Sequence, residues 1–163
     1  MRLDLKNIIR TPGAALPFQF SMDLSDVEWN GEYPVSRPVD AVGTVRNMAG
    51  ALVLTCQLST VLDLTCDRCL KPFSEEKTVS YETLLAAELE QEDNDDIVLL
   101  EDEELDADEL LRDVFILAMD SKHLCSEDCK GLCPGCGVDL NVEQCRCQKE
   151  IDPRLAGLAK FFE

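Results

Sequence analysis

Nine cysteines in 163 residues constrain this chain more than any other feature of its sequence. Residues 1–6 contain no apolar segment and so predict no secretory signal, which leads us to expect a cytoplasmic protein. Thiols stay reduced in the cytosol, where clustered cysteines are typical of metal ligation or redox chemistry and not of disulfides. The cysteines therefore predict metal ligation as the first hypothesis, with redox chemistry as the other use of clustered thiols.

The strongest motif is Cys133-Pro-Gly-Cys136-Gly, which has the spacing of a zinc knuckle. Its glycines permit positive φ, so backbone amides can point at the sulfurs and both thiolates can reach one ion. Cys145 and Cys147 can complete a tetrahedral site, although C-x-C is a less usual ligand pair than C-x-x-C. Because the segment has little hydrophobic mass, we expect it to need Zn²⁺ to hold its shape.

Four further cysteines form two more pairs, Cys66 with Cys69 and Cys125 with Cys129. A second Cys₄ site that uses all four would leave only Cys56, which lies on the apolar side of its predicted strand. The alternative is a single site with mixed ligands and several spare thiols. The only histidine, His123, is predicted to be an ordinary surface residue.

No pattern in the chain favours catalysis. A closed Cys₄ zinc site is architectural, because catalytic zinc keeps a water position and usually recruits His or a carboxylate. The Cys66/Cys69 pair could be redox-active, but it lacks the βαβ context of thioredoxin-like sites. We therefore expect no enzymatic activity and no catalytic residues, with a metal or thiol enzyme as the weaker alternative.

Alternating hydrophobicity predicts an antiparallel β body over residues 1–87. Strands are expected at residues 16–24, 39–46, 52–66 and 78–85, with a bulge at Gly43 and a turn at residues 47–50. In the longest strand, one parity is almost entirely apolar and should be buried: Leu52, Leu54, Cys56, Leu58, Leu62, Leu64 and Cys66. The period of two therefore predicts a β body that is either an antiparallel sheet or a partial barrel.

A helix is expected over residues 106–120, where Asp106-Ala107-Asp108-Glu109 resembles a capping box. Its buried stripe is predicted as Leu110, Val114, Leu117 and Ala118. An acidic connection (88–105) precedes it, and a zinc-binding segment with a short terminal helix from Asp152-Pro153 (121–163) follows. The predicted fold is α+β, as a single compact domain.

The formal net charge is −18, and most of it comes from residues 88–113, which hold 14 acidic side chains and one basic one. One interpretation is a solvated connection that stays extended because its like charges repel one another. The more specific interpretation is an arm that binds a basic partner. Because a surface this acidic repels phosphate backbones, broad nucleic-acid binding is not expected. Basic proteins are the favoured electrostatic partners.

Three separated stretches together resemble the YceD family of large ribosomal RNA subunit accumulation proteins. They are Leu64-Thr65-Cys66-Asp67-Arg68-Cys69-Leu70, Cys129-Lys-Gly-Leu-Cys-Pro-Gly-Cys-Gly and Ile151-Asp152-Pro153-Arg154-Leu155-Ala156-Gly157-Leu158. Family members differ in cysteine content, so the resemblance implies that zinc stabilises this branch and is not the shared activity.

The resemblance implies a role in 23S ribosomal RNA accumulation or processing and in large-subunit assembly. Family genes commonly neighbour one that encodes a small basic ribosomal protein of the large subunit. We therefore expect the partner to be a basic ribosomal protein or a pre-large-subunit particle, with any RNA contact indirect. The alternative is a direct RNA-binding module that uses local cations: Arg37, Arg46, Arg68, Lys71, Lys130 and Arg146.

Overall fold

A computed structural model of the chain describes residues 1–86 and 97–147. The chain folds as two compact units. Unit 1 comprises Met1–Leu64 and Pro72–Lys122, and unit 2 comprises Thr65–Lys71 and the chain from His123 onward. The predicted helix from Asp152 and the first part of the acidic connection lie outside the described residues.

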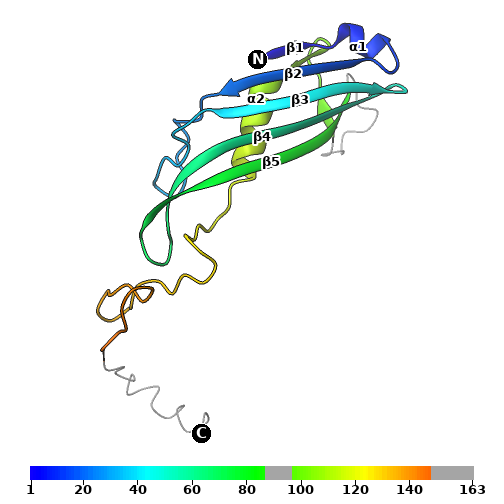
Figure 1. Cartoon of the computed structure of the whole chain (residues 1–163). Helices are drawn as coiled ribbons and strands as arrows, with labels where there is room; N and C mark the ends of the chain where they lie inside the picture. Colours follow the sequence, from blue (N-terminus) through cyan, green and yellow to red (C-terminus); the bar gives the residue numbers. More distant parts are fainter. Residues whose placement is uncertain (87–96, 148–163) are drawn as a thin grey trace, which may run out of the picture. The chain divides into compact units, whose positions relative to one another are not determined.

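Unit 1 is built around a five-stranded sheet with the order β2-β3-β4-β5-β6 (Figure 1). Its strands are β2 (Ala15–Met22), β3 (Val39–Met48), β4 (Ala51–Thr65), β5 (Pro72–Ala86) and the short β6 (Ile97–Leu99), which pairs with β5 in parallel. A separate antiparallel pair joins β1 (Arg2–Asp4) to β7 (Glu104–Asp106). The α+β class with a mostly sheet body is confirmed, whereas nothing in this strand order confirms a partial barrel.

The long strand β4 shows why the period of two dominates this region. Burial alternates along it, and the predicted apolar parity is buried at six leucine and cysteine positions, which are Leu52, Leu54, Cys56, Leu58, Leu62 and Leu64. Opposite faces of a strand receive successive side chains, so one face of β4 builds the core and the other meets solvent. The predicted burial along this strand is confirmed.

The predicted bulge at Gly43 is wrong, because the ladder runs through it without a break. Gly43 pairs with Phe18 on β2 and with Cys56 on β4 in continuous register. A side chain there would collide with the Phe18 ring and the Cys56 Cβ, which fill the space above the glycine. The glycine therefore serves a close approach of neighbours and not an irregular backbone.

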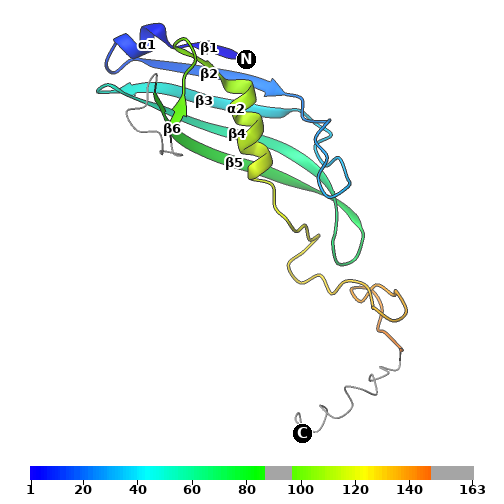
Figure 2. The same ribbon diagram turned by 180° about the vertical axis from the view of Figure 1, so that it is seen from behind.

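The helix α2 (Ala107–Leu117) covers one face of the sheet, which is clearest from behind (Figure 2). Asp106 caps its amino terminus, and its side chain accepts hydrogen bonds from the amides of Asp108 and Glu109. The buried stripe was predicted one position out of phase. Ala107, Leu111 and Phe115 are the buried residues of the helix, whereas Leu117 is 85% exposed. The error arises because the apolar residues of this helix cover more than one face. The hydrophobic periodicity is therefore consistent with either of two adjacent stripes being the buried one.

A short helix, α1 (Lys6–Arg10), is tied to the β3–β4 hairpin by a buried asparagine. The Asn47 amide nitrogen donates to the carbonyl oxygens of Ile8 and Ile9 at 2.8 and 3.0 Å, and its side-chain oxygen accepts from the Gly50 amide. The turn predicted at residues 47–50 is therefore present, with Ala49 and Gly50 both at positive φ. Neither helix in the described part of the chain is long and apolar enough to span a membrane.

Candidate metal centre

Unit 2 gathers eight cysteines into two groups of four. Cluster A consists of Cys66, Cys69, Cys125 and Cys129, and cluster B consists of Cys133, Cys136, Cys145 and Cys147. Within each cluster the sulfurs all lie within 4.8 Å of one another, and all eight thiols are free. The structure thus groups the predicted ligands as the two-site alternative requires, and metal binding itself stays a prediction.

The sulfur separations can be compared with the geometry that a metal demands. Four thiolates about 2.3 Å from a tetrahedral Zn²⁺ stand about 3.8 Å from one another. In cluster A, Cys66 Sγ is 3.8 Å from Cys129 Sγ, and Cys69 Sγ is 3.6 Å from Cys125 Sγ. In cluster B, Cys145 Sγ lies 3.8 Å from Cys136 Sγ and 3.1 Å from Cys133 Sγ. Both sets of four thiols are suitable ligands for Zn²⁺, and all the quoted separations except that of Cys133 and Cys145 are close to the tetrahedral value.

Two C-x-x-C loops start these clusters, and their backbones make the same hydrogen bonds. The Leu70 amide donates to Cys66 O at 2.9 Å, as the Gly137 amide donates to Cys133 O at 2.8 Å. Each first cysteine also donates its own amide to the carbonyl five residues on, at 2.9 Å to Lys71 O and 2.8 Å to Val138 O. The two loops therefore have the same backbone hydrogen bonds, and we call each of them a knuckle.

The knuckle requires a left-handed backbone at its fifth residue. Gly137 meets this requirement with φ of 73°, where glycine is at no disadvantage. In the other knuckle the same place is taken by Leu70, with φ of 58° and 63% of its side chain exposed. A leucine in this conformation is strained, so the surrounding contacts must hold it there.

Backbone amides in the knuckles favour one thiolate in each cluster. In Cys133, hydrogen bonds from the Cys136 amide, the Cys145 thiol and the Gly135 amide lower the thiol pKa to about 6. In Cys66, desolvation is the largest single effect and raises the pKa, but the amides of Cys125, Cys69 and Arg68 together outweigh it and lower the value to about 6. A negative charge is thus ready at one sulfur of each cluster.

One further sulfur in each cluster, that of Cys125 and that of Cys147, resists ionisation while no cation is bound. Hydrogen bonding to the Cys69 thiol, with burial, raises the pKa of Cys125 to about 12, and the Cys136 and Cys145 thiols do the same for Cys147. The resistance comes first from hydrogen bonding with neighbouring thiols, which favours the protonated form, and a divalent cation would remove it. When bound, Zn²⁺ would supply the positive charge that lets four thiolates share one small volume.

Side chains around cluster A connect its knuckle to the loop after Cys129. The Arg68 guanidinium donates to Cys129 O at 2.7 Å, and Asn141 Nδ2 donates to Cys129 Sγ at 3.4 Å. Lys71 forms an ion pair of 2.5 Å with Asp139, which holds the pKa of that carboxyl below its usual range. These contacts orient the ligands, as hydrogen bonds to metal-bound groups commonly do.

Sequence reasoning missed these supporting residues, because none of them belongs to a cysteine spacing. It was also wrong about His123, which is 8% exposed and not on the surface. The His123 amide donates to Asp67 Oδ2 at 2.7 Å, and its carbonyl accepts from the Asp67 amide at 2.9 Å. Its imidazole belongs to neither cysteine cluster, so it supports the knuckle through its backbone.

The remaining cysteine, Cys56, lies apart from both clusters on β4. It is 8% exposed, and burial raises the pKa of its thiol to about 11. A protonated, buried thiol behaves as a small apolar side chain and not as a nucleophile. The unit 1 cysteine therefore belongs to the hydrophobic core.

These features define a class of protein: an α+β body with two tetracysteine clusters whose donor sets suit structural zinc. The family model described as "Large ribosomal RNA subunit accumulation protein YceD" matches residues 54–162, which include all eight clustered cysteines. The chain belongs to the YceD family.

Relatives extend the similarity over most of the chain. It is 29% identical to the Mycobacterium tuberculosis protein named "Uncharacterized protein Rv2926c", over 99% of this chain and 81% of that protein. It is 25% identical to the Arabidopsis thaliana "Large ribosomal RNA subunit accumulation protein YCED homolog 1, chloroplastic", over 88% of this chain and 52% of that protein. No solved structure matches the chain.

Proposed function

We propose that this protein is a non-enzymatic factor of ribosome biogenesis that supports 23S ribosomal RNA accumulation and large-subunit assembly. In this proposal it binds a basic ribosomal protein, free or on a pre-large-subunit particle, through the acidic residues between 88 and 113. Family membership supports the ribosomal role, and the name of the Arabidopsis relative describes the same kind of accumulation. The charge distribution of unit 1 supports the choice of a cationic partner.

The observation that carries the proposal is an acidic pocket of about 290 Å³ in unit 1. We use this name for the cavity lined by five carboxylates together with Val98, Leu99, Leu110 and Arg2, the carboxylates being Glu101, Asp102, Glu104, Asp106 and Glu109. Residues 97–106 form β6, a turn and β7 and are therefore folded, so their charges are held in place. An acidic site with an apolar wall suits lysine or arginine side chains, whose aliphatic stems can pack on that wall.

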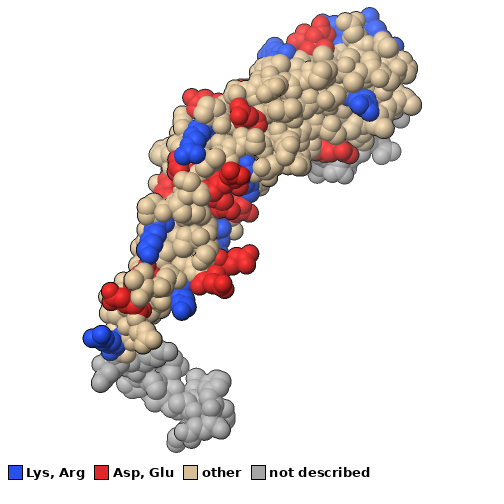
Figure 3. Space-filling model, in the orientation of Figure 1, with Lys and Arg blue, Asp and Glu red and all other residues tan. Residues whose placement is uncertain are grey.

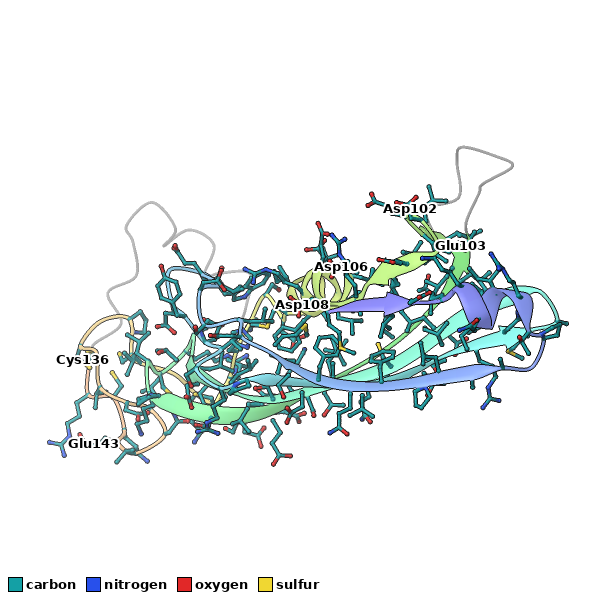
Figure 4. All side chains as sticks on the ribbon, turned by 90° about the horizontal axis from the view of Figure 1, so that it is seen from above. Asp102, Glu103, Asp106, Asp108, Cys136 and Glu143 are labelled. Atoms are coloured by element: carbon teal, nitrogen blue, oxygen red, sulfur yellow. The ribbon has the colours of Figure 1, made fainter. Side chains whose placement is uncertain are left out.

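The carboxylates of this region gather on one side of the sheet. Figure 4 shows Asp102, Glu103, Asp106 and Asp108 on the side of the sheet that carries α2, whereas Figure 3 shows acidic and basic side chains interspersed on the opposite face. Arg2 and Lys6 pair with Asp106 and Glu104 at 3.4 and 3.7 Å, so part of the charge is neutralised internally. Glu101, Asp102 and Glu109 form no ion pair with any described residue, and they remain available to a partner.

Direct RNA binding is the second candidate, and the contacts of the local cations weaken it. In unit 2, Arg68 is held by backbone carbonyls, and Lys71 is paired with Asp139. In unit 1, Arg37 lies 3.7 Å from Asp63, and Arg46 is at the other end of β3. Each zinc bound by four thiolates would add a net charge of −2, which opposes a phosphate backbone further.

In this proposal the zinc sites maintain the shape of unit 2 and take no part in a reaction. Four thiolates fill a tetrahedral coordination sphere, so a loaded cluster leaves no position for water or substrate. A protein of this kind acts by presenting surfaces, and its effect on RNA levels follows from what it binds.

The test is affinity capture from native lysate at low and at high salt, with captured proteins and RNA both identified. The pocket variant carries Glu101→Gln, Asp102→Asn and Glu109→Gln, and a matched control neutralises Glu28, Glu32 and Glu75 in the same unit. Wild type and control should capture a basic ribosomal protein at low salt only, and the pocket variant should lose it. Equal capture by the pocket variant would eliminate the proposed mode of binding, and capture of RNA without protein would favour the second candidate.

A further inference from the structure

The two edges of the β2–β5 sheet are not equivalent. At one edge, β2 has β3 as its single partner among the described strands, and it contains Pro17, which has no amide hydrogen to offer another strand. At the other edge, β5 is fifteen residues long, and among the described strands β6 pairs with it only at Leu84, Leu85 and Ala86. Most of β5 therefore has one side without a neighbouring strand in the described part of the chain.

The direction of the unpaired groups follows from the contact with β6. Ala86 O accepts a hydrogen bond of 2.8 Å from the Leu100 amide, so the backbone groups of Ala86 point away from β4. Burial alternates without interruption from Glu76 to Leu85, so residues of the same parity point the same way. The N–H and C=O groups that point to this side and meet no described strand are those of Glu76, Thr78, Ser80 and Glu82.

An added strand would also cover apolar surface. Val79 and Tyr81 pack against the core from β5, but both are only half-buried, as is Phe73 near the start of the strand. Their side chains lie on the inner face of the sheet, whereas Glu76 and Glu82 are exposed on the outer face. A neighbouring strand would therefore meet apolar groups on one face and carboxylates on the other.

Charge decides which kind of strand fits. In an antiparallel pair of two copies centred on Val79, Glu76 of each copy would stand opposite Glu82 of the other, and directly opposed like charges destabilise a sheet. Lys77 cannot relieve this repulsion, because it is paired with Asp120 at 2.6 Å. A strand with basic side chains on its outer face and apolar ones on its inner face would instead complement the carboxylates and the apolar side chains of β5.

We propose that the free edge of β5 binds an extended protein segment of alternating basic and apolar residues, which adds to the sheet as a strand. The inference rests on the proposed function for the cationic nature of the partner. It places the partner's main chain on Glu76, Thr78, Ser80 and Glu82 and its apolar side chains over Val79 and Tyr81. Main-chain hydrogen bonds supply affinity in this mode of recognition, and the alternating side chains supply specificity.

The test uses a labelled synthetic peptide of alternating lysine and valine, with fluorescence polarisation of the full chain as the readout. A peptide of the same composition, with its lysines in one block and its valines in another, is the matched ligand control. Ser80→Pro removes one outward-facing amide, and Ser80→Ala keeps it. Ser80→Pro should weaken binding about tenfold, the effect of one lost and unsatisfied hydrogen bond, and Ser80→Ala should leave it within about twofold.

A second variant guards against misfolding of the proline variant. Glu76→Lys with Glu82→Lys leaves the backbone intact and should reverse the preference toward a peptide of alternating glutamate and valine. Equal binding of the alternating and block peptides by wild type, or unchanged binding by both edge variants, would overturn the inference. A concentration-dependent dimer that Ser80→Pro abolishes would also overturn it, because a second copy would then occupy the edge.

The acidic-pocket variant separates this inference from the proposed function. It should still bind the alternating peptide, because its substitutions lie outside β5. If the edge variants retain the natural basic partner and the acidic-pocket variant loses it, the edge inference fails and the proposed function stands. If all three variants lose that partner, both sites contribute to binding and the edge inference is supported.

Discussion

The left-handed residue of the second knuckle gives the sharpest test of the metal centre. Gly137 has φ of 73°, and an added Cβ would meet no atom within 4 Å. Gly137→Ala therefore introduces no clash and costs only the conformational energy of an alanine in this region, about 1 to 2 kcal/mol. Because zinc binding requires the knuckle conformation, that cost should weaken zinc binding at cluster B about fivefold to thirtyfold.

The assay is competition with a colorimetric chelator, which resolves the zinc equivalents held by one chain. Gly31→Ala is the matched control, because Gly31 has φ of 84° and open space around it but lies in unit 1. It should leave both zinc equivalents unchanged. Leu70→Gly is the reverse change in the other knuckle, and it should bind zinc at cluster A at least as tightly as wild type, since it removes a strained leucine.

Two results would refute this reasoning. If Gly137→Ala bound zinc as tightly as wild type, the left-handed backbone would not be part of metal binding. If Gly31→Ala weakened zinc binding as much as Gly137→Ala, the effect would be a general loss of stability. Circular dichroism of the zinc-loaded variants distinguishes a local change from unfolding.

Three further predictions concern composition, capping and pH. Wild type should hold two zinc ions per chain by elemental analysis, and Cys66→Ser and Cys136→Ser should each lose one. Asp106→Ala should destabilise unit 1 by about 1 kcal/mol in thermal unfolding through loss of the helix cap, whereas Asp113→Ala, which caps nothing, should not. In the metal-free protein, Cys66 and Cys133 should be thiolates at neutral pH, because their pKa values lie near 6 instead of 9.0. Their contribution to the free energy of unfolding is full above pH 9.0 and is lost as the pH falls through about 6. Thiolate absorbance would follow this titration. A lack of thiolate absorbance at neutral pH would contradict the hydrogen bonds given as the cause of the low pKa values.

Much of unit 1 was predictable because one face of its sheet is solvated. Alternation in β4 predicts which side chains are buried, since each polar residue marks the side that meets water. Gly43 shows where this reasoning stops. A glycine in a strand indicates either a bulge or a close approach, and only the positions of Phe18 and Cys56 decide between them.

The cysteines of the candidate site were predictable, whereas their supporting residues were not. Spacing selects ligands, because a short loop must bring two sulfurs to one ion. The contacts of Arg68 and Lys71 join segments about sixty to seventy residues apart, and no local pattern marks such pairs. The Asn141 contact with Cys129 is shorter in sequence, but no cysteine spacing marks it either. The repeated knuckle was also hidden, because Leu70 stands where Gly137 gives the usual signal for a left-handed turn.

The two clusters differ in the length of chain that they close, and this difference predicts unequal roles. In cluster A the sulfurs of Cys69 and Cys125 are 56 residues apart in sequence, whereas in cluster B those of Cys136 and Cys145 are 9 apart. In the chain-entropy treatment of cross-links, closing these loops is worth about 4 and about 2.6 kcal/mol respectively. Cys69→Ser should therefore lower the stability of zinc-loaded unit 2 more than Cys136→Ser does, as followed by hydrogen exchange at the amides of Thr65–Lys71. Faster exchange there in Cys136→Ser than in Cys69→Ser would contradict the argument, because cluster B would then be the one that holds the two segments of unit 2 together.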